Sequence, residues 1–305
     1  MNLRLMSLNI RQFCPQLSVP VIKQRINMRY KQILAAEDWE FLRDSTTVQL
    51  KGVYGPSALT IAVDHNGTTV VGTGTTFVAS GVAKGWMLRV GSESQPYIVA
   101  TAPGDTTLTV ETNYGGTTQT AASFNTFKNL YSPAVGDVSE IESIVYKRPL
   151  AEKSLDFLNR LDPERDSTGE PQYYSIKRQT SSSDGTVSFE VWPVPDADYV
   201  VTVNYKKVIT DLTADTDSPL FRAEVLEPGA LWDCYRLSFA VTQNPTYVGL
   251  ARDAKADFEG ELRRMTIKDL ATASLPRRVR NVVEGVVFDD NYALDHDVDW
   301  LDDFG

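Results

Sequence analysis

Apolar residues recur at three- and four-residue steps near both ends of the chain, and at every second position between the ends. The first helical pattern covers residues 18–43, where Ser18 can cap the helix and Pro20 suits its first turn. Its apolar positions are Ile22, Ile26, Tyr30, Ile33 and Leu34, followed by Trp39, Phe41 and Leu42. This spacing predicts one long amphipathic helix.

Two further helical patterns lie in residues 226–241 and 247–270, separated by Asn244-Pro245, which breaks a helix. The second pattern carries an apolar stripe made of Tyr247, Leu250, Ala251, Ala254, Phe258, Leu262 and Met265. Such a stripe is typical of a helix that packs on a core. The pattern therefore predicts a C-terminal pair of helices.

Residues 46–128 are rich in Thr and Gly and contain short alternating runs. The predicted strands are residues 59–63, 68–71, 86–90, 97–101 and 107–111. Asn66-Gly67 separates the first two, and this dipeptide favours a tight hairpin turn. Several short strands with regular turns predict a small β-barrel or sandwich, inserted between helical and mixed segments.

Alternation returns in residues 140–147, 173–179, 186–192 and 199–207, with a short helix predicted at 153–161 and a turn at 181–185. Pro193 and Pro195 end the strands on either side of them because proline cannot donate to a ladder. We expect residues 186–192 and 199–207 to pair as an antiparallel hairpin. The short connections predict a mainly antiparallel sheet.

The W-P-x-P-D-x-x-Y turn at 192–199, the following strand that ends in Tyr205-Lys206-Lys207, and Asp38-Trp39-Glu40-Phe41-Leu42 resemble the head–tail connector proteins of tailed phages. This family is also called adaptor, neck or tail tubular protein A-like. The resemblance implies a virion structural protein that forms a twelve-subunit ring between the portal protein and the tail or nozzle proteins. DNA would pass through the ring without sequence-specific binding.

The expected fold class is α+β, with a helical bundle, an antiparallel β-sheet, an inserted β-barrel or sandwich and an extended C-terminal arm. The resemblance implies that the bundle joins the N-terminal helix to the C-terminal pair. The expected domains are a connector core (residues 1–45 and 129–275), the inserted β-domain (46–128) and the arm (276–305).

Charge and cysteine content narrow the function further. The net charge of −10 argues against tight nucleic-acid binding, but it is compatible with a channel through which DNA slides. Cys14 and Cys234 form no CxxC motif, which indicates buried thiols in a reducing compartment. The sequence shows no signal-peptide pattern and no membrane span, so we expect assembly in the host cytoplasm.

The last residues change character. A basic run of Arg277, Arg278 and Arg280 precedes residues 281–305, which contain no Lys or Arg. The acids of that segment are Glu284, Asp289, Asp290, Asp295, Asp297, Asp299, Asp302 and Asp303. Its large apolar residues are Val286, Val287, Phe288, Tyr292, Leu294, Trp300, Leu301 and Phe304. Aromatic anchors with acidic steering predict an arm that docks on a neighbouring subunit or the portal, and the basic run would face an acidic portal surface or a neighbour's acidic arm.

Catalytic, metal and cofactor sites are not expected. Asp295, Asp297 and Asp299 begin like a calcium loop, but Trp300 occupies its glycine position, which leaves only a less regular metal site open. Neither His65 nor His296 has a recognisable nucleophile or orienting residue as a partner, so no catalytic triad is indicated. The many carboxylates leave a glycosidase-like pair possible. The alternative function is a receptor- or carbohydrate-binding protein of a tail appendage.

Overall fold

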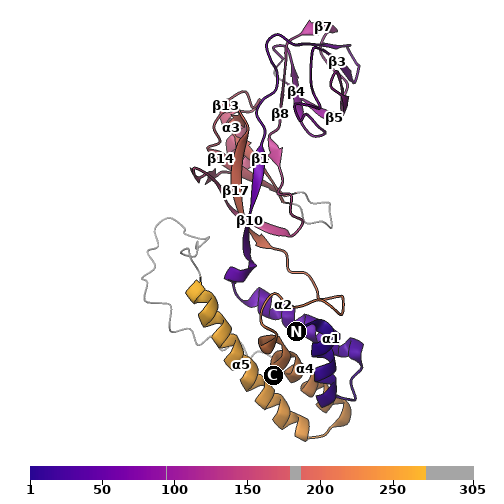
Figure 1. Cartoon of the computed structure of the whole chain (residues 1–305), viewed down its shortest axis with the longest axis vertical. Helices are drawn as coiled ribbons and strands as arrows, with labels where there is room; N and C mark the ends of the chain where they lie inside the picture. The colour runs from indigo at the N-terminus through magenta and orange to yellow at the C-terminus, as the bar shows by residue number, and fades with distance from the viewer. Residues whose placement is uncertain (94, 179–186, 273–305) are drawn as a thin grey trace.

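The computed structural model describes residues 1–93, 95–178 and 187–272, and the molecule is elongated (Figure 1). A β-module lies at one end of the long axis, a pair of sheets occupies the middle, and helices form the other end. Each region has its own cluster of buried apolar side chains. The described chain is therefore an α+β protein with three hydrophobic cores.

Four of the helices pack together and form what we call the helical body: α1, α2, α4 and α5. The described helices are α1 (Leu3–Phe13), α2 (Val19–Ala36), α3 (Leu155–Leu161), α4 (Ala223–Thr242) and α5 (Thr246–Thr272). The buried faces of α1 and α2 join those of α4 and α5 in one cluster. Residues from both ends of the chain thus build a single core. Of the stripe predicted for α5, Leu250 is exposed and the other members pack on this core.

The helix predicted for residues 18–43 ends earlier, at Ala36. The chain then forms a 3₁₀ turn, η1 (Glu40–Leu42), and enters strand β1 (Arg43–Leu50). Trp39 and Leu42 are nevertheless buried, and the Trp39 indole Nε1 donates to the Ile33 carbonyl over 2.8 Å. The apolar run after Ala36 therefore folds back on α2 instead of extending it. The N-terminal helix α1 was not predicted from the sequence.

The middle region consists of two sheets, ordered β1-β17-β10-β11 and β12-β14-β15-β9, and a short β13–β16 pairing. The other strands are β9 (Leu130–Tyr131), β10 (Val138–Tyr146), β11 (Arg148–Pro149), β12 (Ala151–Glu152), β13 (Thr168–Gly169), β14 (Tyr173–Arg178), β15 (Val187–Trp192), β16 (Val194–Pro195) and β17 (Tyr199–Lys207). Most pairings are antiparallel, as expected, but β12–β14 and β13–β16 are parallel. The turn predicted at 181–185 lies outside the described residues.

The predicted hairpin between residues 186–192 and 199–207 is wrong. Both strands form, but β15 pairs with β14 and β9, whereas β17 pairs with β1 and β10. Phe189 and Val201 contribute to the same hydrophobic cluster from different sheets. The proline-rich connection therefore arches from one sheet to the other. Alternation of apolar residues fits both arrangements, because each strand still presents one face to the core.

The β-module is one curved, seven-stranded sheet with the order β7-β2-β3-β6-β5-β4-β8. Its strands are β2 (Thr60–Val63), β3 (Thr69–Thr73), β4 (Met87–Val90), β5 (Tyr97–Gly104), β6 (Thr107–Val110), β7 (Gln119–Ala122) and β8 (Phe124–Phe127). The predicted β2–β3 hairpin is confirmed, and Asn66 in its turn has a φ of 61°. Residues 46–50, assigned to the insertion from the sequence, pair with β17 in the middle region.

A buried ion pair links the loop after α3 to strand β15. The side chains of Arg165 and Glu190 are 8% and 6% exposed, and Arg165 Nε lies 2.5 Å from Glu190 Oε1. Beside them, burial alone would raise the pKa of Asp162. Hydrogen bonds donated by the Ser167 and Asp166 amides and the Trp192 indole outweigh burial and lower that pKa. The loop is therefore held to the sheet by buried, hydrogen-bonded charge.

Removing one partner of this pair should destabilise the protein strongly. We expect Glu190→Ala to reduce the free energy of unfolding by about 3 kcal/mol, because it leaves the Arg165 guanidinium buried without its carboxylate. The double variant Arg165→Met with Glu190→Leu should lose less. Urea unfolding at neutral pH measures both effects.

The matched control is Lys147→Ala, which removes an ion pair to Glu170 whose side chains are 64% and 56% exposed. This change should leave the urea midpoint close to that of the unmodified protein, because an exposed ion pair contributes little to stability. Equal unfolding midpoints for Glu190→Ala and Lys147→Ala would contradict the assignment.

Candidate interaction sites on the helical body and its junction

A groove opens on the helical body between α2, α4 and α5, with a volume of about 820 Å³. Its apolar walls include Met28, Ile33, Trp232, Phe258 and Leu262. Its charged residues are Arg25, Arg29, Asp233, Arg236, Lys255 and Glu259. We call this feature the helical groove. It combines an apolar surface with an excess of positive charge.

Arg29 organises the helical groove. Its guanidinium lies 4.6 Å from the centre of the Trp232 ring and 5.1 Å from that of Phe258. Arg29 Nε and Nη2 also donate to the two carboxylate oxygens of Asp233, over 3.0 and 2.5 Å. A cation held by two rings and a bidentate carboxylate fixes the relative positions of α2, α4 and α5.

Gly229 on α4 allows this close packing. A Cβ atom at Gly229 would lie 2.9 Å from both Arg29 Cγ and Phe258 Cδ2, closer than such atoms approach in proteins. A larger residue at this position would therefore displace Arg29 or Phe258 and change the groove.

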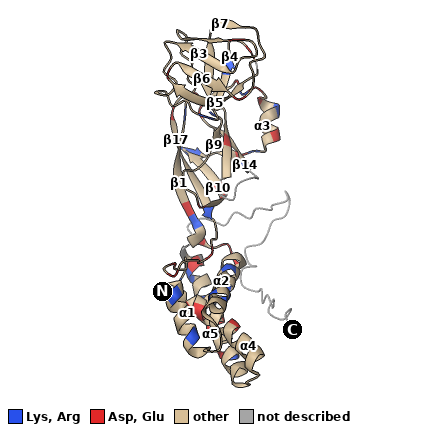
Figure 2. Ribbon diagram, turned by 90° about the vertical axis from the view of Figure 1, so that its right-hand side faces the viewer, with Lys and Arg blue, Asp and Glu red and all other residues tan. Residues whose placement is uncertain are grey.

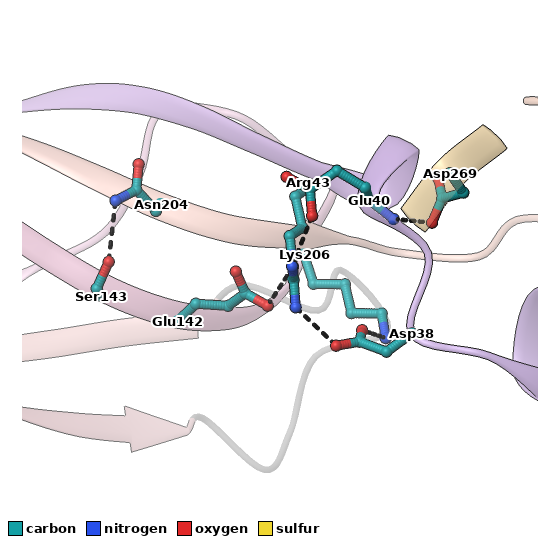
Figure 3. A network of polar contacts seen from close by, with 8 residues as sticks. All are labelled: Asp38, Glu40, Arg43, Glu142, Ser143, Asn204, Lys206 and Asp269. Carbon is teal, nitrogen blue, oxygen red and sulfur yellow. Dashed lines mark hydrogen bonds and ion pairs between the residues drawn. The ribbon is translucent and has the colours of Figure 1, made fainter. Parts of the chain in front are cut away.

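The second site is the junction between the helical body and the middle sheets, which we call the charged junction (Figure 3). Arg43, the first residue of β1, donates to Asp38 Oδ2 over 2.7 Å, to Glu40 Oε2 over 2.6 Å and to Glu142 Oε1 on β10 over 3.0 Å. Lys206 on β17 donates to Asp38 Oδ1 over 2.7 Å. Two cations thus hold three carboxylates from the linker and the sheet.

The charged junction also reaches α5. The Glu40 amide donates to the buried carboxylate of Asp269 over 2.9 Å. Burial acts to lower the pKa of Arg43, but its hydrogen bond to Glu40 and the charges of Glu142 and Asp38 raise it. Arg43 therefore stays protonated while it bridges the linker and the sheet, and Asp269 holds the same linker to the helical body.

The residues that the sequence singled out for docking lie outside the described residues. These are the basic run at Arg277, Arg278 and Arg280 and the arm residues Val286, Val287, Phe288, Tyr292, Leu294, Trp300, Leu301 and Phe304. Sequence reasoning missed the helical groove and the charged junction. Arg25 and Arg29 stand one turn apart beside the apolar stripe of α2, but Asp233, the carboxylate partner of Arg29, lies about two hundred positions away.

Charged residues are unevenly distributed (Figure 2). The ribbon of the β-module is mostly free of them, whereas the helical body and its junction carry many. Cys14 and Cys234 are buried free thiols, and burial raises the pKa of Cys234 to about 12. Within residues 1–93, 95–178 and 187–272, no group of three or more His, Cys, Asp or Glu side chains could hold a metal ion. None of the described helices has the length and apolar character needed to cross a bilayer.

An elongated α+β protein with separate cores, an open groove with apolar walls and a charged junction has the features of a structural protein that contacts other proteins. The family comparison is more specific, because the family model of the SU10 adaptor protein matches residues 75–280 of the 305. The chain belongs to this family of phage head–tail adaptors, which are virion structural proteins and not a class of enzymes. The matched range includes residues 75–128, which the sequence pattern predicts to be part of an insertion. A search of curated proteins finds no match.

Loss of Arg43 should loosen the charged junction. We expect Arg43→Ala to lower the free energy of unfolding by about 1–2 kcal/mol, because three neighbouring carboxylates lose their shared cation. Hydrogen exchange should accelerate in peptides that cover residues 37–44 and 140–146, as measured by mass spectrometry.

Arg222→Ala provides the comparison, since the Arg222–Glu224 pair is 63% and 65% exposed and neither residue takes part in the hydrogen bonds of Arg43. It should leave exchange in those peptides unchanged. Unaltered exchange in Arg43→Ala would show that the junction does not depend on this cation.

Proposed function

We propose that the protein is the head–tail adaptor of a tailed phage and forms a ring of twelve copies between the portal protein and the tail or nozzle proteins. The ring extends the DNA channel in the neck of the virion. Assembly takes place in the host cytoplasm. The protein acts mechanically, by holding other proteins in position, and not by catalysis.

The observation that carries this proposal is the SU10 adaptor family match over residues 75–280. The elongated arrangement of three cores is compatible with a subunit that contacts different partners at different heights. The net charge of −10 favours a channel in which DNA moves without tight binding. Both properties support the adaptor role, but only the family match distinguishes an adaptor from other structural proteins.

In this proposal the connector core comprises residues 1–45 and 129–275, with a bundle of the N-terminal helix and the C-terminal helix pair beside the sheet. Residues 51–128 form the inserted β-domain, since residues 46–50 pair with β17 in the middle region. Residues 276–305 form the arm that docks on the portal or on the next subunit. Aromatic anchors supply the apolar contact and acids steer the approach.

Negative-stain electron microscopy of the purified protein, alone and mixed with its cognate portal, tests the proposed ring. We expect twelve-fold rings in at least one of the two samples, because a closed ring needs every subunit to offer complementary faces to its neighbours. A stable trimer that does not associate with the portal would overturn the proposal and favour the tail-appendage alternative.

Deletion of residues 281–305 tests the arm separately. The shortened protein should keep its circular dichroism spectrum, because the three described cores are built from residues before 273. Its binding to the portal, measured by co-sedimentation, should fall at least about tenfold, which corresponds to about 1.4 kcal/mol of lost docking energy. Portal binding that equals that of the full chain would exclude a docking role for the arm.

A further inference from the structure

The helical groove has more positive charge than its own carboxylates neutralise. Four cationic residues line it, against the two acids Asp233 and Glu259. Asp233 is bound by Arg29, and Glu259 lies 3.6 Å from Lys255. Among the described residues, Arg25 and Arg236 form no ion pair, and Arg25 Nε is buried without a hydrogen-bond acceptor. The groove can therefore accept an additional anionic group.

The lining of the groove also favours apolar side chains in the bound partner. Trp232, Phe258 and Leu262 line the groove together with Met28, which is 42% exposed. A free phosphate or a simple carboxylate would leave this apolar surface in contact with water. A polypeptide with both acids and large apolar residues would satisfy the two properties together.

One segment of this chain has that chemistry. Residues 281–305 contain eight acids, no Lys or Arg, and aromatic residues that include Trp300 and Phe304. A second acidic segment, residues 211–217, already has partners on α2, since Lys31 pairs with Asp211 and Lys23 with Asp215. The C-terminal segment therefore combines the negative charge and the apolar residues that the groove can accommodate.

The C-terminal segment can reach the groove within one molecule. Leu262 lines the groove on α5, and α5 ends at Thr272, ten residues and about 15 Å further along the helix axis. Each residue between Thr272 and Trp300 can span up to about 3.3 Å when extended. Together these residues can span several times the distance from the end of α5 to the groove. A tethered partner also has an effective concentration of the order of millimolar.

We propose that the helical groove binds the acidic C-terminal segment, residues 281–305, of the same chain when the protein is free in solution. The acids lie beside Arg25 and Arg236, and an aromatic side chain covers the apolar wall formed by Trp232 and Phe258. This contact goes beyond the adaptor role and does not depend on it. It shields the segment's aromatic residues from water until another binding surface replaces the groove.

Photo-cross-linking in the full-length protein tests this contact. A photoreactive phenylalanine analogue replaces Trp300, the dilute protein is irradiated, and mass spectrometry identifies the cross-linked peptides. We expect cross-links to the α2, α4 or α5 peptides that line the groove, in the band of a single chain. The same analogue at Val71, which is 50% exposed in the β-module, should give no cross-link to these peptides.

Charge reversal then measures the electrostatic contribution to the contact between the groove and the C-terminal segment. Arg25→Glu with Arg236→Glu should reduce the cross-link at least about tenfold, equivalent to about 1.4 kcal/mol. The control is Arg252→Glu with Arg263→Glu, the same charge change at exposed α5 positions outside the groove, which should have little effect. Asp299→Lys, Asp302→Lys and Asp303→Lys, added to the groove variant, should restore the cross-link and thereby exclude misfolding as its cause.

Three results would overturn the proposal. Cross-links that fall outside the groove, or that survive charge reversal, would show that the groove does not recognise the acidic segment. Cross-links that appear only between two chains would replace the same-chain contact with one from a second copy. No portal protein is used, so this test and the test of ring formation succeed or fail independently.

Discussion

Arg43 donates hydrogen bonds to three carboxylates at the place where the chain passes from the helical body into the middle sheets. The linker that supplies two of these carboxylates is also held by Asp269 of α5. A short segment is thereby tied on both sides by charge, in addition to its covalent connection. The direction in which the sheets leave the helical body depends on this arrangement, because the two regions have separate hydrophobic cores.

Membership of the SU10 adaptor family gives these features a common context. An adaptor has to present several surfaces to different neighbours at fixed distances, and separate cores joined by a braced linker suit that task. The groove contributes a surface of another kind, because Arg29, Trp232 and Phe258 hold three helices together while Arg25 and Arg236 remain without ion pairs among the described residues. The residues that hold the helices together and the two cations without ion pairs are thus neighbours on α2 and α4.

Local pattern in the sequence predicted most of the strands and the C-terminal helices, because periodicity reports which face of an element is buried. The pattern could not predict which strands pair or which side chains meet across the fold. Alternation in residues 187–191 and 199–205 is the same whether the strands pair with each other or face each other across a core, so the hairpin was predicted where an arch exists. The groove was missed for a related reason, since its central contact joins Arg29 to Asp233 and Trp232, more than two hundred residues away. The end of α2 was placed too late because Trp39 and Leu42 are buried by a turn that keeps a helix-like spacing of apolar residues.

The core of the helical body contains residues from Leu3 to Leu42 and from Leu212 to Phe258, with the sheets and the β-module encoded between them. On the ribosome, α1 and α2 therefore emerge before α4 and α5, the partners that cover their apolar faces. The β-module and the middle sheets are complete in sequence before α4 is synthesised, so their cores can close earlier. Translation thus gives the molecule an order of maturation in which the first helices made are among the last to be buried. Until then, the apolar side chains of Ile22, Ile26 and Tyr30 stay exposed to water.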